Sequence, residues 1–199
     1  MIGLVLCGGQ STRMGTDKGL FINTKKITWA QHCFSLLAKL EIPVVISVNS
    51  TQYNDYKRIF PLQELIPDNN DLDIHGPLLG LLSVHLKQPA HDIFVLACDM
   101  VAMNAAVLNY LYDHYLQYNK EKTCVFTHNN ACEPLCSIYK AKDLKKIYQL
   151  HQKGFLEKHS LKYCIENLNI RLVDIPFEWE KCFKNFNTPL SVNDALWQE

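Results

Sequence analysis

The chain lacks a net charge, because 20 lysine and arginine residues balance 20 aspartate and glutamate residues over 199 positions. Proteins that bind nucleic acids or anionic membranes usually carry a strongly basic surface, so this balance argues against both partners. No apolar run approaches the roughly 18 residues that a membrane-spanning helix requires, and the sequence opens without a cationic leader segment. These absences predict a cytoplasmic protein.

The eight cysteines lack the Cys-x-x-Cys spacing that is typical of structural zinc sites. Cys124, Cys132 and Cys136, with His128 between them, are the one grouping that resembles a metal site, but the spacing is wrong for a zinc knuckle. In a cytoplasmic chain cysteines stay reduced. We therefore expect free thiols, most of them small apolar residues of the core.

Two common phosphate-binding motifs are also absent. The P-loop requires a Gly-Lys-Ser/Thr ending, and the dinucleotide fingerprint requires Gly-x-Gly-x-x-Gly; neither occurs in this chain. ATPases of the P-loop class and dehydrogenases of the Rossmann class are therefore disfavoured.

A different glycine-rich loop is present near the N-terminus. Residues 6–18 read Leu-Cys-Gly-Gly-Gln-Ser-Thr-Arg-Met-Gly-Thr-Asp-Lys and follow a short apolar run. Glycines let backbone N–H groups approach a phosphate without obstruction from a Cβ atom. Arg13 offers a planar fork for phosphate oxygens and Lys18 a compact positive charge. This combination predicts a loop that holds a triphosphate and stabilises a pyrophosphate leaving group.

Short apolar runs alternate with segments of helical periodicity along the chain. We expect strands at 2–7, 44–48, 93–98, 124–127, 134–139 and 171–175, and helices at 28–40, 76–86, 104–118, 141–151 and 155–165, with one more after Pro189. Repeats, low-complexity tracts and obvious linkers are absent. The prediction is a single α/β domain with a mostly parallel, twisted sheet and helices on both faces.

In such sheets ligands bind beyond the carboxyl ends of the strands. Gly8, Asn49 and Asp99 each follow one of the predicted strands, so the sequence places them at one edge of the sheet. A carboxylate at the tip of a buried strand is costly unless a cation lies beside it, and Mg²⁺ is the natural partner for Asp99. Capping of the following helix is the alternative role for this residue.

The N-terminal loop resembles the nucleotidyltransferase signature Leu-x-Gly-Gly-x-Ser-x-Arg-Met-Gly-x-Asp-Lys, most closely in the form found in molybdenum cofactor guanylyltransferases. Cys7 stands where this family usually has alanine. The resemblance implies a Rossmann-like nucleotidyltransferase fold and extends from Gly3 to the C-terminal helix. It assigns residues 1–100 to nucleotide binding and residues 101–199 to acceptor binding.

The resemblance also implies roles for individual residues. Arg13, Lys18 and Asp99 would be catalytic, with Mg²⁺ held at Asp99. The nucleotide-binding residues would be Leu6, Cys7, Gly8, Gly9, Lys18, Asn49, Asp68 and Asp99. For Asp68 an Asx-turn is the alternative role, and Ser47 is an alternative to Asn49. The motif Gly-Pro-Leu-Leu-Gly at residues 76–80 would let a base or ribose lie against its glycines.

Asn185 and Asn187 would lie on the acceptor side, because Asn-Phe-Asn-Thr-Pro at residues 185–189 resembles a family motif. Without the family this stretch is a turn followed by a helix N-terminus, with Thr188 as cap and Pro189 at the first helical position. The chain departs from the family at Met100 and Val101, where Thr-Pro is usual, and at residues 153–165, where an arginine-bearing stretch is usual.

The function that the resemblance implies is transfer of GMP from GTP to the phosphate of molybdopterin or its molybdenum form, with release of pyrophosphate. A GTP-binding adaptor protein and molybdoenzyme clients would be its partners. Two alternatives remain at this point. One is another small nucleotidyltransferase that uses CTP or UTP and a sugar or sugar-alcohol phosphate acceptor. The other is a GTP-binding protein that has lost catalysis.

Overall fold

The computed structural model describes residues 1–8, 17–118, 121–129 and 131–186. Seven strands form one sheet in the order β3-β2-β1-β4-β6-β5-β7. They are β1 (Ile2–Leu6), β2 (Val44–Val48), β3 (Leu65–Pro67), β4 (Ile93–Ala97), β5 (Thr123–His128), β6 (Ala131–Tyr139) and β7 (Ile170–Asp174). Within this sheet β6 alone runs antiparallel to its neighbours, β4 and β5. The predicted mostly parallel sheet is confirmed.

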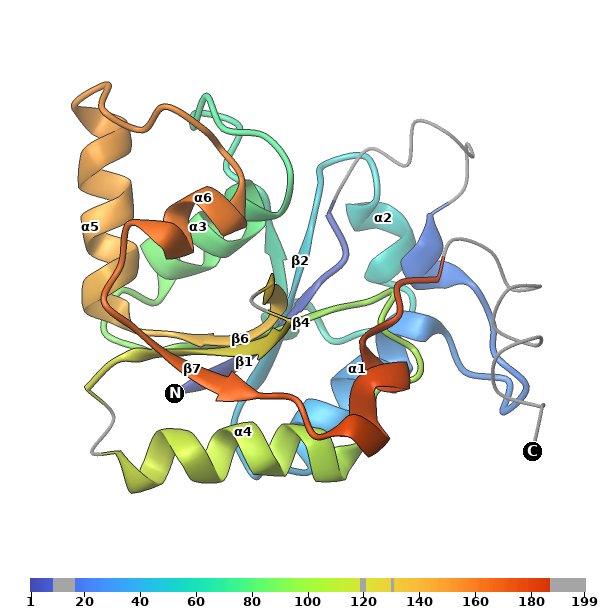
Figure 1. The fold of residues 1–199 in the computed structure, drawn as a ribbon. Helices are drawn as coiled ribbons and strands as arrows, with labels where there is room; N and C mark the ends of the chain where they lie inside the picture. Colours follow the sequence, from blue (N-terminus) through green and yellow to red (C-terminus); the bar gives the residue numbers. More distant parts are fainter. Residues whose placement is uncertain (9–16, 119–120, 130, 187–199) are drawn as a thin grey trace.

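Helices cover both faces of the sheet, as predicted (Figure 1). One face carries α1 (Trp29–Ala38) and α4 (Ala105–Gln117), and the other carries α3 (Pro77–Lys87), α5 (Ala141–Gln152) and α6 (Leu161–Glu166). Two short elements, α2 (Tyr53–Tyr56) and the 3-10 helix η2 (Leu62–Glu64), lie between β2 and β3. Two further 3-10 helices are η1 (Lys18–Leu20) and η3 (Phe177–Phe183). Among the described helices none is long and apolar enough to cross a membrane.

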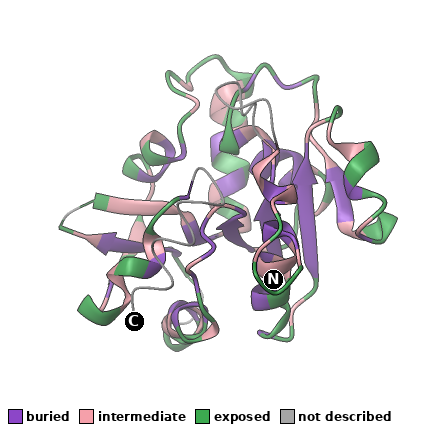
Figure 2. Cartoon of the chain, turned by 90° about the vertical axis from the view of Figure 1, so that its right-hand side faces the viewer, coloured by how far each residue is buried: buried purple, intermediate pink, exposed green. Residues whose placement is uncertain are grey.

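The sheet is the centre of the core (Figure 2). Every residue of β1, β2 and β4 is buried, which agrees with the continuous apolar runs that strands covered on both faces require. Helix α1 begins where the sequence predicts a start, because Thr28 and Gln31 form a reciprocal capping box. All eight cysteines are free thiols and seven are buried, which confirms their expected place in the core.

The predicted helix at 155–165 is wrong in its first half. Gly154, with φ of +73°, ends the preceding helix α5, and residues 155–160 are not helical. Helix α6 begins only at Leu161, where the Ser160 side chain accepts a hydrogen bond from the Tyr163 amide. Phe155 is 68% exposed, so it does not provide the apolar anchor that the periodicity requires. Strand β3 and helix α2, each only a few residues long, were not expected.

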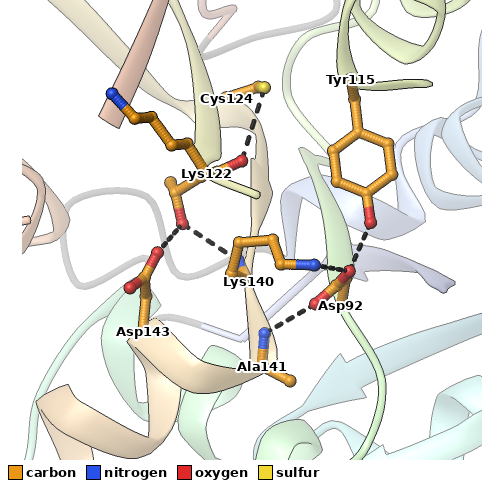
Figure 3. A network of polar contacts seen from close by, with 8 residues as sticks. Asp92, Tyr115, Lys122, Cys124, Lys140, Ala141 and Asp143 are labelled. Atoms are coloured by element: carbon orange, nitrogen blue, oxygen red, sulfur yellow. Dashed lines mark hydrogen bonds and ion pairs between the residues drawn. The ribbon is translucent and has the colours of Figure 1, made fainter. Parts of the chain in front are cut away.

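A polar network joins the start of β4 to α4 and α5 (Figure 3). The Asp92 carboxylate accepts hydrogen bonds from the Tyr115 hydroxyl, the Lys140 ammonium and, at 2.8 Å, the Ala141 amide. Thr123 at the start of β5 accepts from the Lys140 amide at 3.0 Å. Burial would raise the pKa of Asp92, but the hydrogen bonds of Lys140, Tyr115 and Ala141 outweigh it and lower the pKa. This network lies at the amino ends of the parallel strands.

Candidate active site

The opposite edge of the sheet gathers the predicted nucleotide-binding residues. Gly8 lies two residues after β1, Asn49 one residue after β2, Asp68 one after β3 and Asp99 two after β4. These four strands are parallel neighbours in the sheet, so their carboxyl ends share one edge. The expected convergence of Gly8, Asn49 and Asp99 is therefore confirmed.

The Lys18 ammonium lies 3.0 Å from Asp99 Oδ2. The two side chains are 25% and 17% exposed, so the ion pair is accessible to a ligand yet partly shielded from water. Lys18 begins η1, directly after the glycine-rich loop, and the turn after β4 presents Asp99. The sequence signature and the end of a strand 81 residues away thus place a cation and a carboxylate side by side.

Gly8 lies against Asp68. A Cβ atom at Gly8 would stand 2.7 Å from Asp68 Oδ2, so glycine is required for this approach. Asp68 Oδ1 accepts a hydrogen bond from the Ser47 hydroxyl at 2.6 Å. Burial raises the pKa of Asp68 and this hydrogen bond offsets it in part. The carboxylate is therefore ready to accept further hydrogen-bond donors.

Ser47 organises this part of the site and was considered only as an alternative to Asn49. It is fully buried, and its carbonyl oxygen accepts hydrogen bonds from the amides of Cys7 at 3.0 Å and Gly8 at 3.1 Å. It therefore fixes both the start of the glycine-rich loop and the carboxylate of Asp68. The sequence signal for this role was a single polar residue within the apolar, β-branched run Val-Val-Ile-Ser-Val of β2.

Asp17 anchors the far end of the glycine-rich loop. Its carboxylate accepts hydrogen bonds from the Gly19 amide at 2.9 Å, the Tyr56 hydroxyl at 3.1 Å and Gln52 Nε2 at 2.7 Å. Gln52 also donates to the Cys7 carbonyl at 3.2 Å, so one side chain ties both ends of the loop together. Burial raises the pKa of Asp17, and the three hydrogen bonds offset it in part. No sequence motif predicts that Gln52 and Tyr56 contact Asp17.

Asn49 has a structural role in addition to its predicted one. Its side-chain oxygen accepts hydrogen bonds from the Thr51 amide, the Thr51 hydroxyl and the Gln52 amide at 2.7–3.0 Å. This turn positions Gln52 for its contacts with the loop. Nucleotide binding by Asn49 remains a prediction.

The glycines of the Gly-Pro-Leu-Leu-Gly segment serve the fold. A Cβ atom at Gly80 would stand 2.4 Å from the Ser47 hydroxyl, so this glycine lets α3 pack closely against the sheet. Contact of this segment with a base or ribose remains a prediction. Gly76 has φ of +71°, which favours glycine at the turn before α3.

The family departures after Asp99 face the interior. Met100 is 1% exposed and Val101 8%, and Val101 packs with Trp29 and Phe186. They fill the core beneath the turn that presents Asp99. The departure at 153–165 leaves Lys153 and Lys158 exposed, with Lys158 over the Tyr163 ring.

The C-terminal part of the chain returns to the site. The Phe186 amide donates a hydrogen bond to the Asp99 carbonyl at 3.1 Å, which places exposed Asn185 beside the turn after β4. Gly9 and Arg13, predicted to bind phosphate, lie outside the described residues, as do Asn187 and the expected C-terminal helix. Their roles remain predictions.

The residues around Asp99 are compatible with Mg²⁺. This ion is held by one or two carboxylates together with substrate phosphates and water, so a cage of protein ligands is not required. Asp99 supplies a partly exposed carboxylate at the strand edge. Among the described residues no group of three histidine, cysteine or acidic side chains forms a complete metal site, which also leaves Cys124, Cys132 and Cys136 without support as zinc ligands.

A mostly parallel α/β sheet with a glycine-rich sequence after β1 and acidic residues at its carboxyl edge is typical of nucleotide-binding proteins of the α/β class. Comparison with known proteins identifies the family: residues 3–166 match the MobA-like NTP transferase domain, and the chain belongs to this family. It is a nucleotidyltransferase-type protein.

Curated relatives extend this finding over the full chain. A probable molybdenum cofactor guanylyltransferase of Geobacillus sp. is 29% identical over 200 residues, which cover 98% of both chains. The molybdenum cofactor guanylyltransferase of Campylobacter jejuni is 26% identical and covers 92% of this chain and 89% of its own.

Solved structures support the fold. The molybdopterin-guanine dinucleotide biosynthesis protein A of Archaeoglobus fulgidus has a TM-score of 0.74 at 19% identity, covering 98% of this chain and 96% of that one. The bifunctional IspDF of Campylobacter jejuni has a TM-score of 0.65 at 16% identity and covers 92% of this chain and 51% of that one.

Proposed function

We propose that this protein transfers GMP from GTP to the terminal phosphate of molybdopterin or its molybdenum form and releases pyrophosphate. Full-length relatives that are named guanylyltransferases support this specific reaction. The observation that carries the proposal is the Lys18–Asp99 pair, 3.0 Å apart, at the strand edge beside Gly8. A nucleotidyl transfer requires a cation for the leaving group and a carboxylate for a metal ion at one place.

The reaction is an in-line displacement at the α-phosphorus. An oxygen of the acceptor phosphate forms the new bond, and the bond from phosphorus to the bridging oxygen of the pyrophosphate breaks. Such reactions depend on positioning and charge stabilisation more than on covalent catalysis. Lys18 meets the negative charge that develops on the pyrophosphate, and Arg13 is proposed to share this task.

Asp99 would hold Mg²⁺, which when bound neutralises phosphate charge and helps orient the nucleotide. Asp68, beside Gly8, offers a carboxylate to the donor groups of guanine, which carries two adjacent N–H donors. Asn49 is proposed to contact the nucleoside, and Asn185 and Asn187 the acceptor. The amides of Cys7 and Gly8 donate to the Ser47 carbonyl, which holds the start of the loop against β2.

The test is pyrophosphate release with Mg²⁺ from each of the four nucleoside triphosphates, with and without molybdopterin or its molybdenum form. Release that requires both GTP and the acceptor is the expected result. A preference for CTP or UTP would contradict the guanylyl assignment and favour a different nucleotidyltransferase of the same fold. Binding of GTP without release in the presence of the acceptor would indicate a protein that has lost catalysis.

A further inference from the structure

A cavity lies at the same edge of the sheet as Asp99, on the side of β5, β6 and β7. It has a volume of about 390 Å³ and is lined by His128, Glu133, Ile175, Glu180, Lys181, Phe183 and Lys184. His128 ends β5, Glu133 lies near the start of antiparallel β6, and Ile175 follows β7, so all three belong to the edge that also presents Asp99. This volume is in the range of pockets that hold small ligands.

The cavity lies next to the candidate active site around Lys18 and Asp99. Its last lining residue, Lys184, precedes Phe186 by two positions, and the Phe186 amide is bonded to the Asp99 carbonyl at 3.1 Å. On the sheet itself, Cys136 pairs with Leu96, three residues before Asp99, and Glu133 comes three residues before Cys136 on the antiparallel strand. Glu133 and Asp99 therefore both extend beyond the same end of the β4–β6 pair.

The register of β6 shifts beside Glu133. Val125 pairs with Ser137, but the next residue, Phe126, pairs with Glu133, so β6 bulges between these two positions. The Ser137 hydroxyl closes the bulge by donating to the Glu133 carbonyl at 2.8 Å, and the Tyr139 hydroxyl donates to the Pro134 carbonyl at 2.9 Å. Bulges commonly redirect a side chain beside a functional site. Here the bulge fixes the backbone of Glu133 at the cavity.

The Glu133 side chain is half-buried, and no described residue donates a hydrogen bond to its carboxylate. Burial raises the pKa of Glu133, offset in part by the charge of His128. The other acidic residue of the cavity, Glu180, is paired with His128 at 3.4 Å. Of the two carboxylates that line the cavity, Glu133 is therefore the one without a hydrogen-bond or ion-pair partner among the described residues.

The other residues that line the cavity provide apolar surface and positive charge, which suits a flat ring with polar edges. The Phe183 side chain is held edge-on against Phe126, with ring centroids 5.0 Å apart, and Ile175 adds an apolar surface. Lys181 and Lys184 add positive charge to the lining, and Lys184 lies two residues before Phe186, whose amide is bonded to the Asp99 carbonyl. Two carboxylate oxygens match two parallel N–H donors, as in an aminopyrimidinone ring with its ring N–H and exocyclic amino group.

We propose that Glu133 determines acceptor specificity by binding the paired N–H donors of an aminopyrimidinone ring, the recognition face of a pterin, in the cavity between η3 and the β5–β6 edge. This inference rests on the proposed function for the identity of the acceptor. The ring would lie beside Phe183, and its phosphate-bearing end would extend past Lys184 towards Asp99.

The test compares two fluorescent ring compounds with the wild-type protein. Pterin has the ring N–H and the 2-amino group, whereas lumazine has an oxygen in place of the amino group. A site built to accept hydrogen bonds from an amino group rejects an analogue that presents an oxygen there. We expect wild-type protein to bind pterin at least about 10-fold more tightly than lumazine. Equal binding, or binding of neither compound, would overturn the proposal.

The Glu133→Gln variant tests the residue itself. The substitution keeps the size of the side chain but replaces one acceptor oxygen with a donor, so the preference for pterin should fall to within about 2-fold of lumazine. Glu178→Gln, an exposed position of η3 outside the lining, is the matched control and should keep the full preference. Retention of the preference in Glu133→Gln would refute the assignment.

Two further measurements separate this proposal from the proposed function. GTP affinity should be unchanged in Glu133→Gln, which also shows that the variant is folded. If the wild-type protein transfers GMP to molybdopterin and Glu133→Gln does so with an unchanged KM for the acceptor, the specificity proposal fails and the function stands. If pterin binding depends on Glu133 but no nucleotide supports pyrophosphate release, the site stands and the function fails.

Discussion

Two carboxylates at opposite edges of one sheet differ in how completely they are satisfied. Asp92, before β4, receives three hydrogen bonds, one of them from a lysine, and its pKa is lowered. Asp68, after β3, receives one hydroxyl donor from Ser47, and its pKa is raised by burial. Both side chains are partly buried.

The difference separates stability from function. A carboxylate that is saturated with donors stabilises the fold and has little capacity left for a ligand. One that is partly desolvated and undersaturated costs stability until a ligand supplies donors. Asp92 at the amino edge of the sheet, shown in Figure 3, is of the first kind, and Asp68 at the carboxyl edge is of the second.

The largest expected effect is at the carboxyl edge. Lys18→Ala should lower the rate of pyrophosphate release about 100-fold to 1,000-fold, because the charge that develops on the leaving group loses its cation. Stability should fall by less than about 1 kcal/mol, since the pair with Asp99 is partly exposed.

The measurement is steady-state pyrophosphate release together with thermal unfolding. Lys25→Ala, at an exposed lysine in the loop after η1, is the control and should leave both unchanged. Near-normal release by Lys18→Ala would exclude the proposed role of this residue.

Asp92→Asn tests the amino edge. In contrast to Lys18→Ala, it should lower stability and leave the rate of pyrophosphate release nearly unchanged. The free energy of unfolding should fall by about 2 kcal/mol, because Lys140 loses its charged partner in a setting where both side chains are about 15% exposed. The rate per folded molecule should stay close to that of the wild-type protein.

The pH dependence gives a further check on Asp92. Its folded-state pKa is lowered, so its contribution is present above the unfolded value of 3.8 and is lost as the pH falls through the folded-state pKa. The stability gap between wild type and Asp92→Asn should therefore close in acid. Asp55→Asn removes an exposed ion pair with Arg58 and should cost less than about 0.5 kcal/mol, as the matched surface control.

The sequence allowed the architecture to be predicted better than the network within the site. Continuous apolar runs at 2–7, 44–48 and 93–98 predict strands that are buried on both faces of a parallel sheet. The carboxyl ends of these strands determine where Gly8 and Asp99 lie. The helix at 155–165 was misjudged because a glycine with positive φ ended the previous helix and Phe155 had no core to enter.

The contacts that hold the loop could not be predicted, because they depend on tertiary proximity. Ser47 and Gln52 carry no motif, yet Ser47 holds Asp68 and two amides, and Gln52 connects Asp17 to the Cys7 carbonyl. The close packing of Gly80 against Ser47 could not be predicted either, since Ser47 belongs to a strand more than 30 residues earlier in the chain.

Ser47→Ala should have a smaller effect on both properties. Removing the hydroxyl takes away the donor to Asp68 while the carbonyl that binds Cys7 and Gly8 remains, so stability should fall by about 1–2 kcal/mol. The pKa of Asp68 should rise further, and GTP affinity should fall only a few-fold. Chemical denaturation and GTP titration measure the two effects, with Ser35→Ala, whose hydroxyl bonds an exposed helix carbonyl, as the control. An unchanged stability would show that the 2.6 Å contact contributes nothing net.

Asp68→Asn should have the smallest effect on stability, and its sign is the opposite of that at Asp92. The folded-state pKa of Asp68 is raised, so stability falls as the pH rises from the unfolded value of 3.8 to the folded-state pKa, and the full cost of the ionised carboxylate is present above it. Asparagine keeps an acceptor for Ser47 without the charge, so the variant should gain about 0.5–1 kcal/mol at pH 7. The gain should vanish as the pH falls towards the unfolded value of 3.8. GTP affinity should fall at the same time, because an amide cannot accept both donors of guanine. A variant that is no more stable at pH 7 and binds GTP normally would make Asp68 an ordinary turn residue and remove the contrast between the two edges.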